Sequence, residues 1–188
     1  MPFTDTPLPG IIIFEPAVFP DDRGFFFESY NHRLFTSQGI PNIFVQDNQS
    51  FSSYGVIRGL HYQREPHAQS KLVRVLQGRI LDVVVDLRTG SPQFGQCYSI
   101  ELSSQNKKQI FIPKGFAHGF SVLSETAEIS YKCDAFYNKQ SESGIRFNDP
   151  GLNINWQVPD DKTQVSEKDL MLPGFNASVK DFIFQPGA

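Results

Sequence analysis

Three side chains in strand-like segments have the chemistry to move a proton beside a carbonyl group. His61 lies between Leu60 and Tyr62, Lys71 begins the run KLVRVL, and Tyr131 lies in the run AEISYK. Side chains alternate along a strand, so Tyr131 is expected to share an inward face with apolar neighbours. An inward tyrosine, histidine and lysine would provide an acid, a base and a cation that stabilises an oxyanion. Taken one at a time, each is more often an ordinary core or surface residue.

A run of polar residues supplies the lining that such a site would need. Alternation places four polar side chains on one strand face: Gln46, Asn48, Ser50 and Ser52. A solvent-exposed face is the simpler interpretation of that run alone. However, Arg58 and His61 lie among apolar residues in the next strand-like segment, and His118 follows in the run PKGFAHGF. A barrel interior lined with amides, arginine and histidine is typical of a ligand pocket.

The elements that must position these residues are mainly short strands. Eighteen phenylalanines, six tyrosines, fourteen glycines and thirteen prolines favour strands joined by tight turns. We predict strands over residues 11–14, 24–30, 43–51, 56–63, 71–76, 79–87, 98–102, 108–113, 119–123 and 127–133. Residues 20–24 are a predicted turn, and Gln77-Gly78 is predicted to close a hairpin. The expected fold class is all-β, a sandwich or barrel, with short helices over residues 31–38 and, capped by Ser166, 166–170.

Length and composition indicate a single domain over residues 1–188. The 188 residues are 39% hydrophobic and 20% charged, which is enough apolar mass for one core. Seventeen Lys and Arg against twenty Asp and Glu leave a net charge of −3 without a basic block, so no nucleic-acid partner is expected. Neither a membrane-spanning run nor a signal peptide is recognised, and the cytoplasm is the expected location. Cys97 and Cys133 fit buried structural positions in a reducing compartment.

Two spacings resemble the two halves of the cupin sequence signature. Gly55 precedes His61 with five residues between them, and a later run P-x-G-x-x-H ends at His118. The resemblance implies a cupin jelly-roll barrel. Metal-binding cupins have a second histidine and a glutamate where this sequence has Gln63 and Lys71. An ammonium group beside a divalent cation would be repulsive, so neither a metal nor another cofactor is expected.

A more specific resemblance covers about residues 11 to 172, in both the order and the spacing of its motifs. The motifs lie at residues 22–28, 46–52, 58–63, 82–92, 113–120, 148–150 and 166–169. They are similar to those of the dTDP-4-dehydrorhamnose 3,5-epimerase family. The resemblance implies epimerisation of carbons 3 and 5 of dTDP-4-dehydro-6-deoxy-D-glucose, which gives dTDP-4-dehydro-L-rhamnose.

The same resemblance implies a role for each matching residue. His61 would be the base with Asp169 as its partner, Lys71 would stabilise the enolate, and Tyr131 would be the acid on the opposite face of the sugar. Ten further positions match residues that hold the sugar or the nucleotide: Phe19, Arg23, Glu28, Gln46, Asn48, Arg58, His118, Tyr137, Glu142 and Lys168. Some of these are supplied across a subunit interface in the family, so a homodimer acting on a small-molecule substrate is expected.

Three other functions agree with parts of the sequence. The first is a monofunctional 3- or 5-epimerase of a dTDP-4-keto-deoxysugar. Residues 132–139 lack the Thr and the Pro-Glu often seen there in the family, and relatives that invert only carbon 3 or only carbon 5 share the same four catalytic residue types. A metal-dependent cupin, such as a dioxygenase or a sugar isomerase, would need an acidic ligand in place of Lys71. A non-catalytic sugar-binding cupin would keep the pocket, but it gives no reason for an acid, a base and a cation to occur together.

Overall fold

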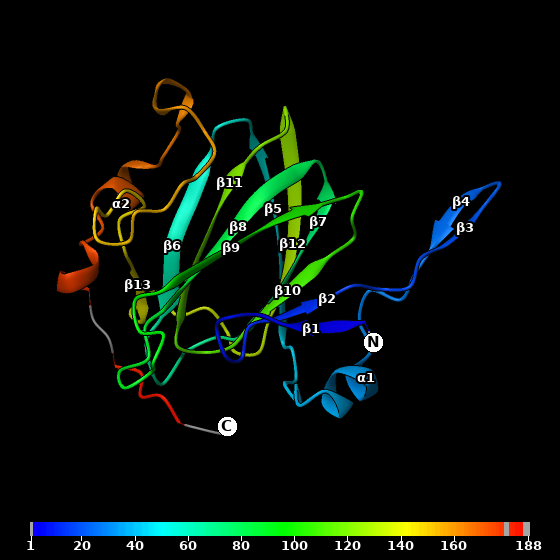
Figure 1. Ribbon diagram of the computed structural model, residues 1–188, viewed down its shortest axis with the longest axis horizontal. Helices are drawn as coiled ribbons and strands as arrows, with labels where there is room; N and C mark the ends of the chain where they lie inside the picture. The colour runs from blue at the N-terminus through cyan, green and yellow to red at the C-terminus, as the bar shows by residue number, and fades with distance from the viewer. Residues whose placement is uncertain (1, 179–180, 186–188) are drawn as a thin grey trace.

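Two antiparallel sheets face each other and enclose the barrel (Figure 1). The computed structural model describes residues 2–178 and 181–185. One sheet has six strands in the spatial order β1 (Phe3–Asp5), β2 (Ile12–Phe14), β10 (Gln109–Ile112), β7 (Lys71–Gln77), β12 (Thr126–Cys133) and β5 (Gln46–Ser53). The other has five in the order β13 (Glu142–Gly144), β6 (Ile57–Gln63), β11 (Phe116–Val122), β8 (Arg79–Asp86) and β9 (Cys97–Ser103). The expected all-β jelly-roll fold is therefore confirmed.

The core between the sheets consists of apolar side chains from both. Val73 and Ile129 of the six-stranded sheet pack in one cluster with Val84 and Phe120 of the five-stranded sheet. Burial of apolar side chains from both sheets supplies the main favourable term in folding. The Tyr131 side chain packs against the same cluster, so this core also supports a residue of the predicted site.

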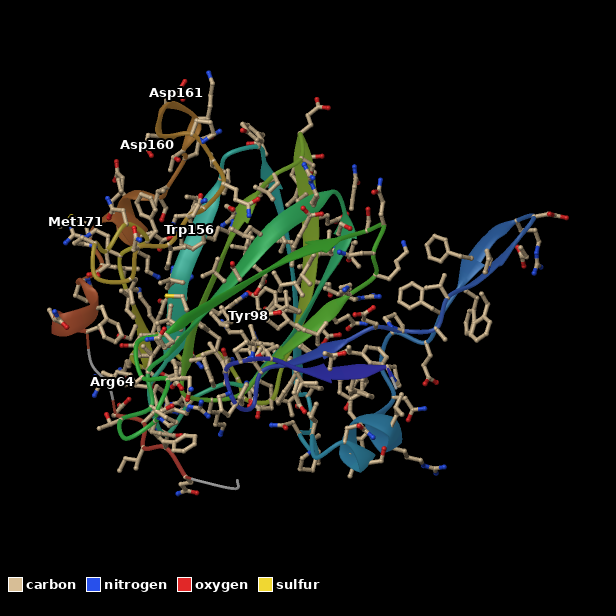
Figure 2. All side chains as sticks on the ribbon, in the orientation of Figure 1. Arg64, Tyr98, Trp156, Asp160, Asp161 and Met171 are labelled. Atoms are coloured by element: carbon tan, nitrogen blue, oxygen red, sulfur yellow. The ribbon has the colours of Figure 1, made fainter. Side chains whose placement is uncertain are left out.

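The five-stranded sheet is covered on its outer side as well. The segment that follows β13 packs Ile145 and Trp156 against Leu81 and Val83 of β8, and Figure 2 places Trp156 in that segment beside β6. Seven of the eight residues of β8 are buried because both of its faces are covered. The same segment contains the short helix α2 (Glu167–Leu170), which brings C-terminal residues to the barrel.

The N-terminal region adds a helix and a projecting hairpin. Helix α1 (His32–Ser37) is capped by Asn31 and buries Phe35 against the outer side of the six-stranded sheet. Strands β3 (Phe19–Asp21) and β4 (Gly24–Phe26) pair only with each other and extend away from the barrel (Figure 1). Phe19, Phe25 and Phe26 on this hairpin are exposed.

Most predicted strands are confirmed, with shifted ends. The structure shortens the predicted strand 24–30 to β4 and shifts the predicted strand 43–51 toward the C-terminus as β5. It adds β1, β3, β13 and two single 3₁₀ turns at 160–162 and 175–177. The predicted turn at 20–24 is narrower than expected, since Pro20 and Asp21 belong to β3. Both predicted helices are present, and Ser166 caps the second as expected.

The hairpin predicted at Gln77-Gly78 is wrong. Strands β7 and β8 belong to different sheets, so the chain crosses from one sheet to the other at this point. Gly78 has a φ of +79°, and a Cβ there would collide with the carbonyl oxygen of Thr126. The turn residues were identified correctly, but local turn chemistry does not determine which sheet the next strand joins.

Two further findings concern burial and the membrane. Cys133 is buried as expected, whereas Cys97 is exposed at the start of β9, so that part of the prediction is wrong. Among the described residues, no helix is long and apolar enough to cross a membrane.

Candidate active site

A hydrogen-bonded histidine–carboxylate pair joins β6 to helix α2. Nε2 of His61 lies 2.6 Å from Oδ1 of Asp169. Leu60 and Tyr62 pack into the outer core cluster, so alternation directs His61 into the barrel. Ser166 caps α2 by accepting the Asp169 N–H at 3.1 Å, which fixes the helix end that carries the carboxylate. The predicted pairing of His61 with Asp169 is thus present in the structure.

Two glycines allow β6 and β11 to approach closely beside this pair. Gly59 has a φ of +128°, and a Cβ on it would lie 2.5 Å from Cα of Gly119. The register of these strands places His118 opposite His61. Larger residues at the two glycine positions would push the strands apart and displace both histidines.

Asp169 is held in its ionised form. Burial would raise the pKa of this carboxyl, but the hydrogen bond and the charge of His61 oppose it, together with the Gly59 N–H and the Ser166 side chain. The net result is a pKa below the ordinary value of 3.8. Because an ionised carboxylate only accepts hydrogen bonds, Nε2 of His61 is the donor in this pair, and in the neutral form of the ring Nδ1 is the nitrogen that carries the lone pair.

Lys71 and Tyr131 come from the opposite sheet. They lie on the neighbouring strands β7 and β12, and Nζ of Lys71 is 5.9 Å from the centre of the Tyr131 ring. A hollow of about 280 Å³ is walled by both side chains and by His61. The structure therefore brings together the predicted base, the predicted cation and the predicted acid.

Burial moves the pKa values of these two groups in opposite directions. It lowers the pKa of the Lys71 ammonium below 10.5, and the nearby Cys133 and Asp82 only partly oppose this change. It raises the pKa of the Tyr131 phenol above 10.0, with the charge of Arg58 opposing. Tyr131 is therefore protonated at neutral pH and able to donate a proton.

Three hollows share His61 in their walls. Besides the hollow of about 280 Å³, one of about 390 Å³ is walled by Arg58, Lys168 and Asp169. A third, of about 170 Å³, extends into the barrel between Arg58, His118 and Tyr131. An extended ligand could thus contact the reacting groups and cationic side chains together.

The rim of the site carries a tyrosine, a glutamate and a lysine. Tyr137 donates its hydroxyl hydrogen to Glu142 at 2.9 Å, and Nζ of Lys168 donates to the same carboxylate at 2.6 Å. Burial would raise the pKa of Glu142, but the bonds from Lys168 and Tyr137 outweigh it and lower that pKa. All three residues were predicted to bind substrate, and the structure places them together.

The remaining inward residues line the same hollows. Nε2 of Gln46 donates to Asn48 Oδ1 at 3.0 Å on β5, and Nε of Arg58 donates to Ser52 at 3.0 Å. The polar face predicted on this strand therefore points inward, with Ser52 buried. His118, on β11, lies at 2.8 Å from the buried carboxylate of Asp82.

Three predicted site residues lie away from these hollows in the single chain. Phe19, Arg23 and Glu28 belong to the β3–β4 region that extends from the barrel (Figure 1). The Arg23 side chain is 89% exposed and is paired with Asp21. None of the three is among the described residues that wall the three hollows.

Sequence reasoning missed Asp82 and Gln69. Asp82 interrupts the apolar run of β8, and this is a usable signal, because a buried carboxylate needs a partner. Gln69 walls the hollow beside Lys71, but it precedes the strand and carries no periodic signal. Across the described ranges, no three His, Cys, Asp or Glu side chains are grouped so that they could hold a metal ion.

Fold and site together define a cupin-like jelly-roll barrel whose polar hollows bring together a histidine–aspartate pair, a lysine and a tyrosine. The chain belongs to the dTDP-4-dehydrorhamnose 3,5-epimerase family, which matches residues 5–177. The dTDP-4-dehydrorhamnose 3,5-epimerase of Pseudomonas aeruginosa is 55% identical over 170 residues, covering 90% of this chain and 93% of the relative.

Solved structures of the family superpose closely on this chain. The dTDP-4-dehydrorhamnose 3,5-epimerase of Elizabethkingia anophelis is 54% identical with a TM-score of 0.88, covering 93% of this chain and 96% of that one. The dTDP-6-deoxy-D-glucose-3,5-epimerase of Legionella pneumophila, in complex with dTDP-4-keto-L-rhamnose, is 44% identical with a TM-score of 0.93. That comparison covers 97% of this chain and 98% of the other.

Proposed function

We propose that this protein inverts carbons 3 and 5 of dTDP-4-dehydro-6-deoxy-D-glucose and so forms dTDP-4-dehydro-L-rhamnose. The relatives named above are 3,5-epimerases of dTDP-linked deoxysugars. One observation carries the assignment of roles: His61 and Tyr131 come from opposite sheets and wall the same hollow. An enolate bound between the sheets would meet a base on one face and an acid on the other, as inversion requires.

In the proposed mechanism, His61 begins each inversion. Its Nδ1 removes the proton from the carbon next to the C4 ketone, and the electrons of the broken C–H bond pass to the C4 oxygen. Asp169, bonded to Nε2 at 2.6 Å, fixes the tautomer and stabilises the imidazolium as it forms. A buried, ionised carboxylate is suited to both roles.

Lys71 and Tyr131 complete each inversion. Lys71 holds its positive charge toward the C4 oxygen, where negative charge develops. Tyr131 then donates its hydroxyl proton to the carbon from the opposite face, and the new C–H bond has the inverted configuration. Each cycle moves one proton in and one out, so the chemistry calls for no oxidant, reductant or redox cofactor.

We assign the other inward side chains to substrate binding. The pyrophosphate of the substrate is anionic, and Arg58 and Lys168 provide cations in one hollow beside His61. Gln46, Asn48 and His118 offer hydrogen bonds to the sugar, and Tyr137 and Glu142 lie at the rim for the nucleotide side of the ligand. These assignments to the pyrophosphate, the sugar and the nucleotide follow the family resemblance and the positions of the residues along the three hollows.

We propose that the protein acts as a homodimer with the β3–β4 hairpin of each subunit completing the site of the other. The hairpin extends from the barrel with three exposed phenylalanines, which is typical of a segment that packs on a partner. Phe19, Arg23 and Glu28 would then reach the nucleotide of the neighbouring subunit.

We also propose a metal-free reaction in the cytoplasm. The fixed charge of Lys71 takes the electrostatic role that a divalent cation has in metal-binding cupins, so turnover in a chelator is the expected result. The two cysteines are free, which fits a reducing compartment.

Solvent exchange tests the reaction. In heavy water with the 4-keto sugar nucleotide, the wild-type enzyme should introduce deuterium at carbons 3 and 5, and nuclear magnetic resonance of the product measures both. His61→Asn should abolish exchange at both carbons, because no base remains. Deuterium at one carbon only would replace the proposal with a monofunctional 3- or 5-epimerase. Undiminished exchange in His61→Asn would remove His61 from its role.

Hybrid dimers test the shared site. We expect His61→Asn and Arg23→Ala to lower turnover when each is assayed alone. A hybrid of the two variants contains one site with intact His61 and, from the other subunit, intact Arg23, so mixing after mild dissociation should restore activity. A mixture no more active than its parents, although sedimentation shows that hybrids have formed, would place Arg23 in its own subunit's site.

A further inference from the structure

The loop between β12 and β13, residues 134–141, carries Tyr137 to the rim of the site. The two residues that flank Tyr137 are both bound through their backbones to one side chain. Nε2 of Gln63 donates to the carbonyl oxygen of Phe136 at 3.2 Å, and the N–H of Asn138 donates to Oε1 of Gln63 at 2.6 Å. A single amide therefore holds the chain on both sides of Tyr137.

The Gln63 side chain uses both ends of its amide in this contact. The second hydrogen of Nε2 goes to the carbonyl oxygen of His67 at 2.7 Å, and Gln63 is buried, with 6% exposed. Two carbonyl acceptors and one N–H donor thus face a group with two donors and one acceptor. A carboxylate would face two carbonyl oxygens without a hydrogen to share, and an apolar side chain would leave all three backbone groups unpaired.

The side chains of His67 and Gln46 also contact this loop. Nδ2 of Asn138 lies 3.3 Å from Nε2 of His67, and Nδ1 of that ring lies 2.8 Å from Oγ of Ser141. The N–H of Tyr137 donates to Oε1 of Gln46 at 2.9 Å. Side chains outside the loop therefore hold the chain around Tyr137, and among them Gln63 is the one that bonds to backbone groups on both sides of this residue.

Gln63 also lies two positions after His61 on β6, so the strand that presents the base presents this amide as well. Metal-binding cupins place their second histidine ligand at this position. Here the polar end of the side chain is directed to the loop backbone, and it takes no part in the proposed proton transfers.

We propose that Gln63 is a positioning residue that holds residues 136–138 so that Tyr137 and Glu142 face the nucleotide part of the substrate. The inference rests on the proposed function and extends it, because it assigns to Gln63 control of ligand affinity through the loop. The chemical step at His61, Lys71 and Tyr131 does not depend on it. Loss of the amide should therefore raise KM and leave kcat nearly unchanged.

The test compares two replacements of similar length, Gln63→Met and Gln63→Glu. Both should raise KM for the 4-keto sugar nucleotide and the Kd for dTDP by about 10- to 100-fold, while kcat stays within about threefold, since two or more hydrogen bonds to backbone are lost. Gln49→Leu is the matched control, because Gln49 lies on the exposed face of β5 and bonds only to Glu128 among the described residues. Its KM and kcat should equal those of the wild type.

Hydrogen exchange of the backbone amides gives a second measurement that needs no turnover. The Tyr137 and Asn138 amides should exchange faster in both Gln63 variants, and amides in β8 should not change. Exchange at β8 rising equally would mean general unfolding and would contradict the positioning role. A fall in kcat at unchanged KM, or a wild-type KM in Gln63→Glu, would also overturn it. If the wild type fails to turn over the keto sugar, the proposed function fails, while amide exchange still decides the role of Gln63.

Discussion

Two histidine–carboxylate pairs lie on adjacent strands of this barrel, and they differ in access to the hollow. His61 and Asp169 are joined at 2.6 Å, and His118 and Asp82 at 2.8 Å, in both cases through Nε2. The His61 side chain is 34% exposed, whereas that of His118 is 9% exposed. Asp169 also has contacts from Gly59 and Ser166, whereas Oδ1 of Asp82 has no hydrogen-bond partner in the described structure.

In the proposed mechanism, the difference in exposure separates a base from a fixed hydrogen-bonding group. A general base must contact substrate and then pass its proton on, and both need an exposed nitrogen. His61 meets this condition because its carboxylate is at the end of a surface helix. His118 is paired with a carboxylate inside β8, where it can hold a ligand group but has less access for proton exchange. We therefore expect the same residue pair on neighbouring strands to serve two tasks, separated mainly by exposure to the hollow.

Replacing each of the two carboxylates in turn should give the largest difference in kcat between the two histidine–carboxylate pairs. Asp169→Asn should lower kcat by roughly 10²–10⁴-fold, because the amide no longer selects the tautomer with a free Nδ1 or stabilises the imidazolium. Asp82→Asn should change kcat by less than about tenfold, since His118 holds substrate in the proposed mechanism. Steady-state kinetics of both variants at pH 7 measure this. Equal losses of kcat would contradict the division of tasks.

The sequence predicts the direction of a strand side chain better than it predicts its distant partner. Alternation alone predicts that Tyr131 points inward and that Gln46 shares a face with Asn48, because the period of a strand fixes its faces, but it does not say which face of the Gln46 strand is buried. The contact between His61 and Asp169 spans 108 residues, and it was expected from the family resemblance only. Local pattern carries no information on which helix returns to which strand, so the partner of the base could not be derived from spacing.

The same limit explains the errors in the fold. Gln77-Gly78 has the residues of a hairpin turn, but the following strand joins the opposite sheet, and that choice depends on the packing of all strands. Phe19 and Arg23 lie on the β3–β4 hairpin and Glu28 follows it, and the sequence pattern of this region says nothing about which surface it packs on. Gln63 could be recognised as an exception to the metal pattern, whereas its bonds to residues 136–138 required the loop to be placed.

The loss of activity at alkaline pH should report the charge of Lys71, which is close enough to Asp82 to be affected by its charge. Because burial lowers the pKa of the Lys71 ammonium, this group loses its proton at a pH below 10.5. We expect kcat/KM to fall as the pH rises through this lowered pKa. The pKa values of Tyr131 and Lys168 are raised, so neither accounts for a loss at lower pH. Asp82→Asn removes an attractive charge near Lys71 and should move the decline to lower pH.

A control for this assignment is Lys71→Arg, in which the guanidinium stays charged throughout the range. Its absolute rate should be lower because its geometry differs, but the alkaline decline should disappear. A decline that persists in Lys71→Arg would mean that another group titrates there.

The smallest expected effect concerns the free energy of unfolding in acid. The ion pair of Asp169 with His61 should contribute to it in a pH-dependent way, whereas an exposed carboxylate should not. The pKa of Asp169 is lowered on folding, so its contribution to the free energy of unfolding is fully present above about pH 4 and is lost as pH falls through its folded value. Asp169→Asn should therefore destabilise the protein by roughly 1–3 kcal/mol at pH 6, the range for a hydrogen bond to a charged group, and by less at pH 3. Asp161, whose side chain is 74% exposed, gives the matched control Asp161→Asn, which should have no measurable effect at either pH. Urea unfolding at the two pH values measures the difference, and a gap between wild type and Asp169→Asn that widens in acid would mean that the carboxylate is not held ionised by His61.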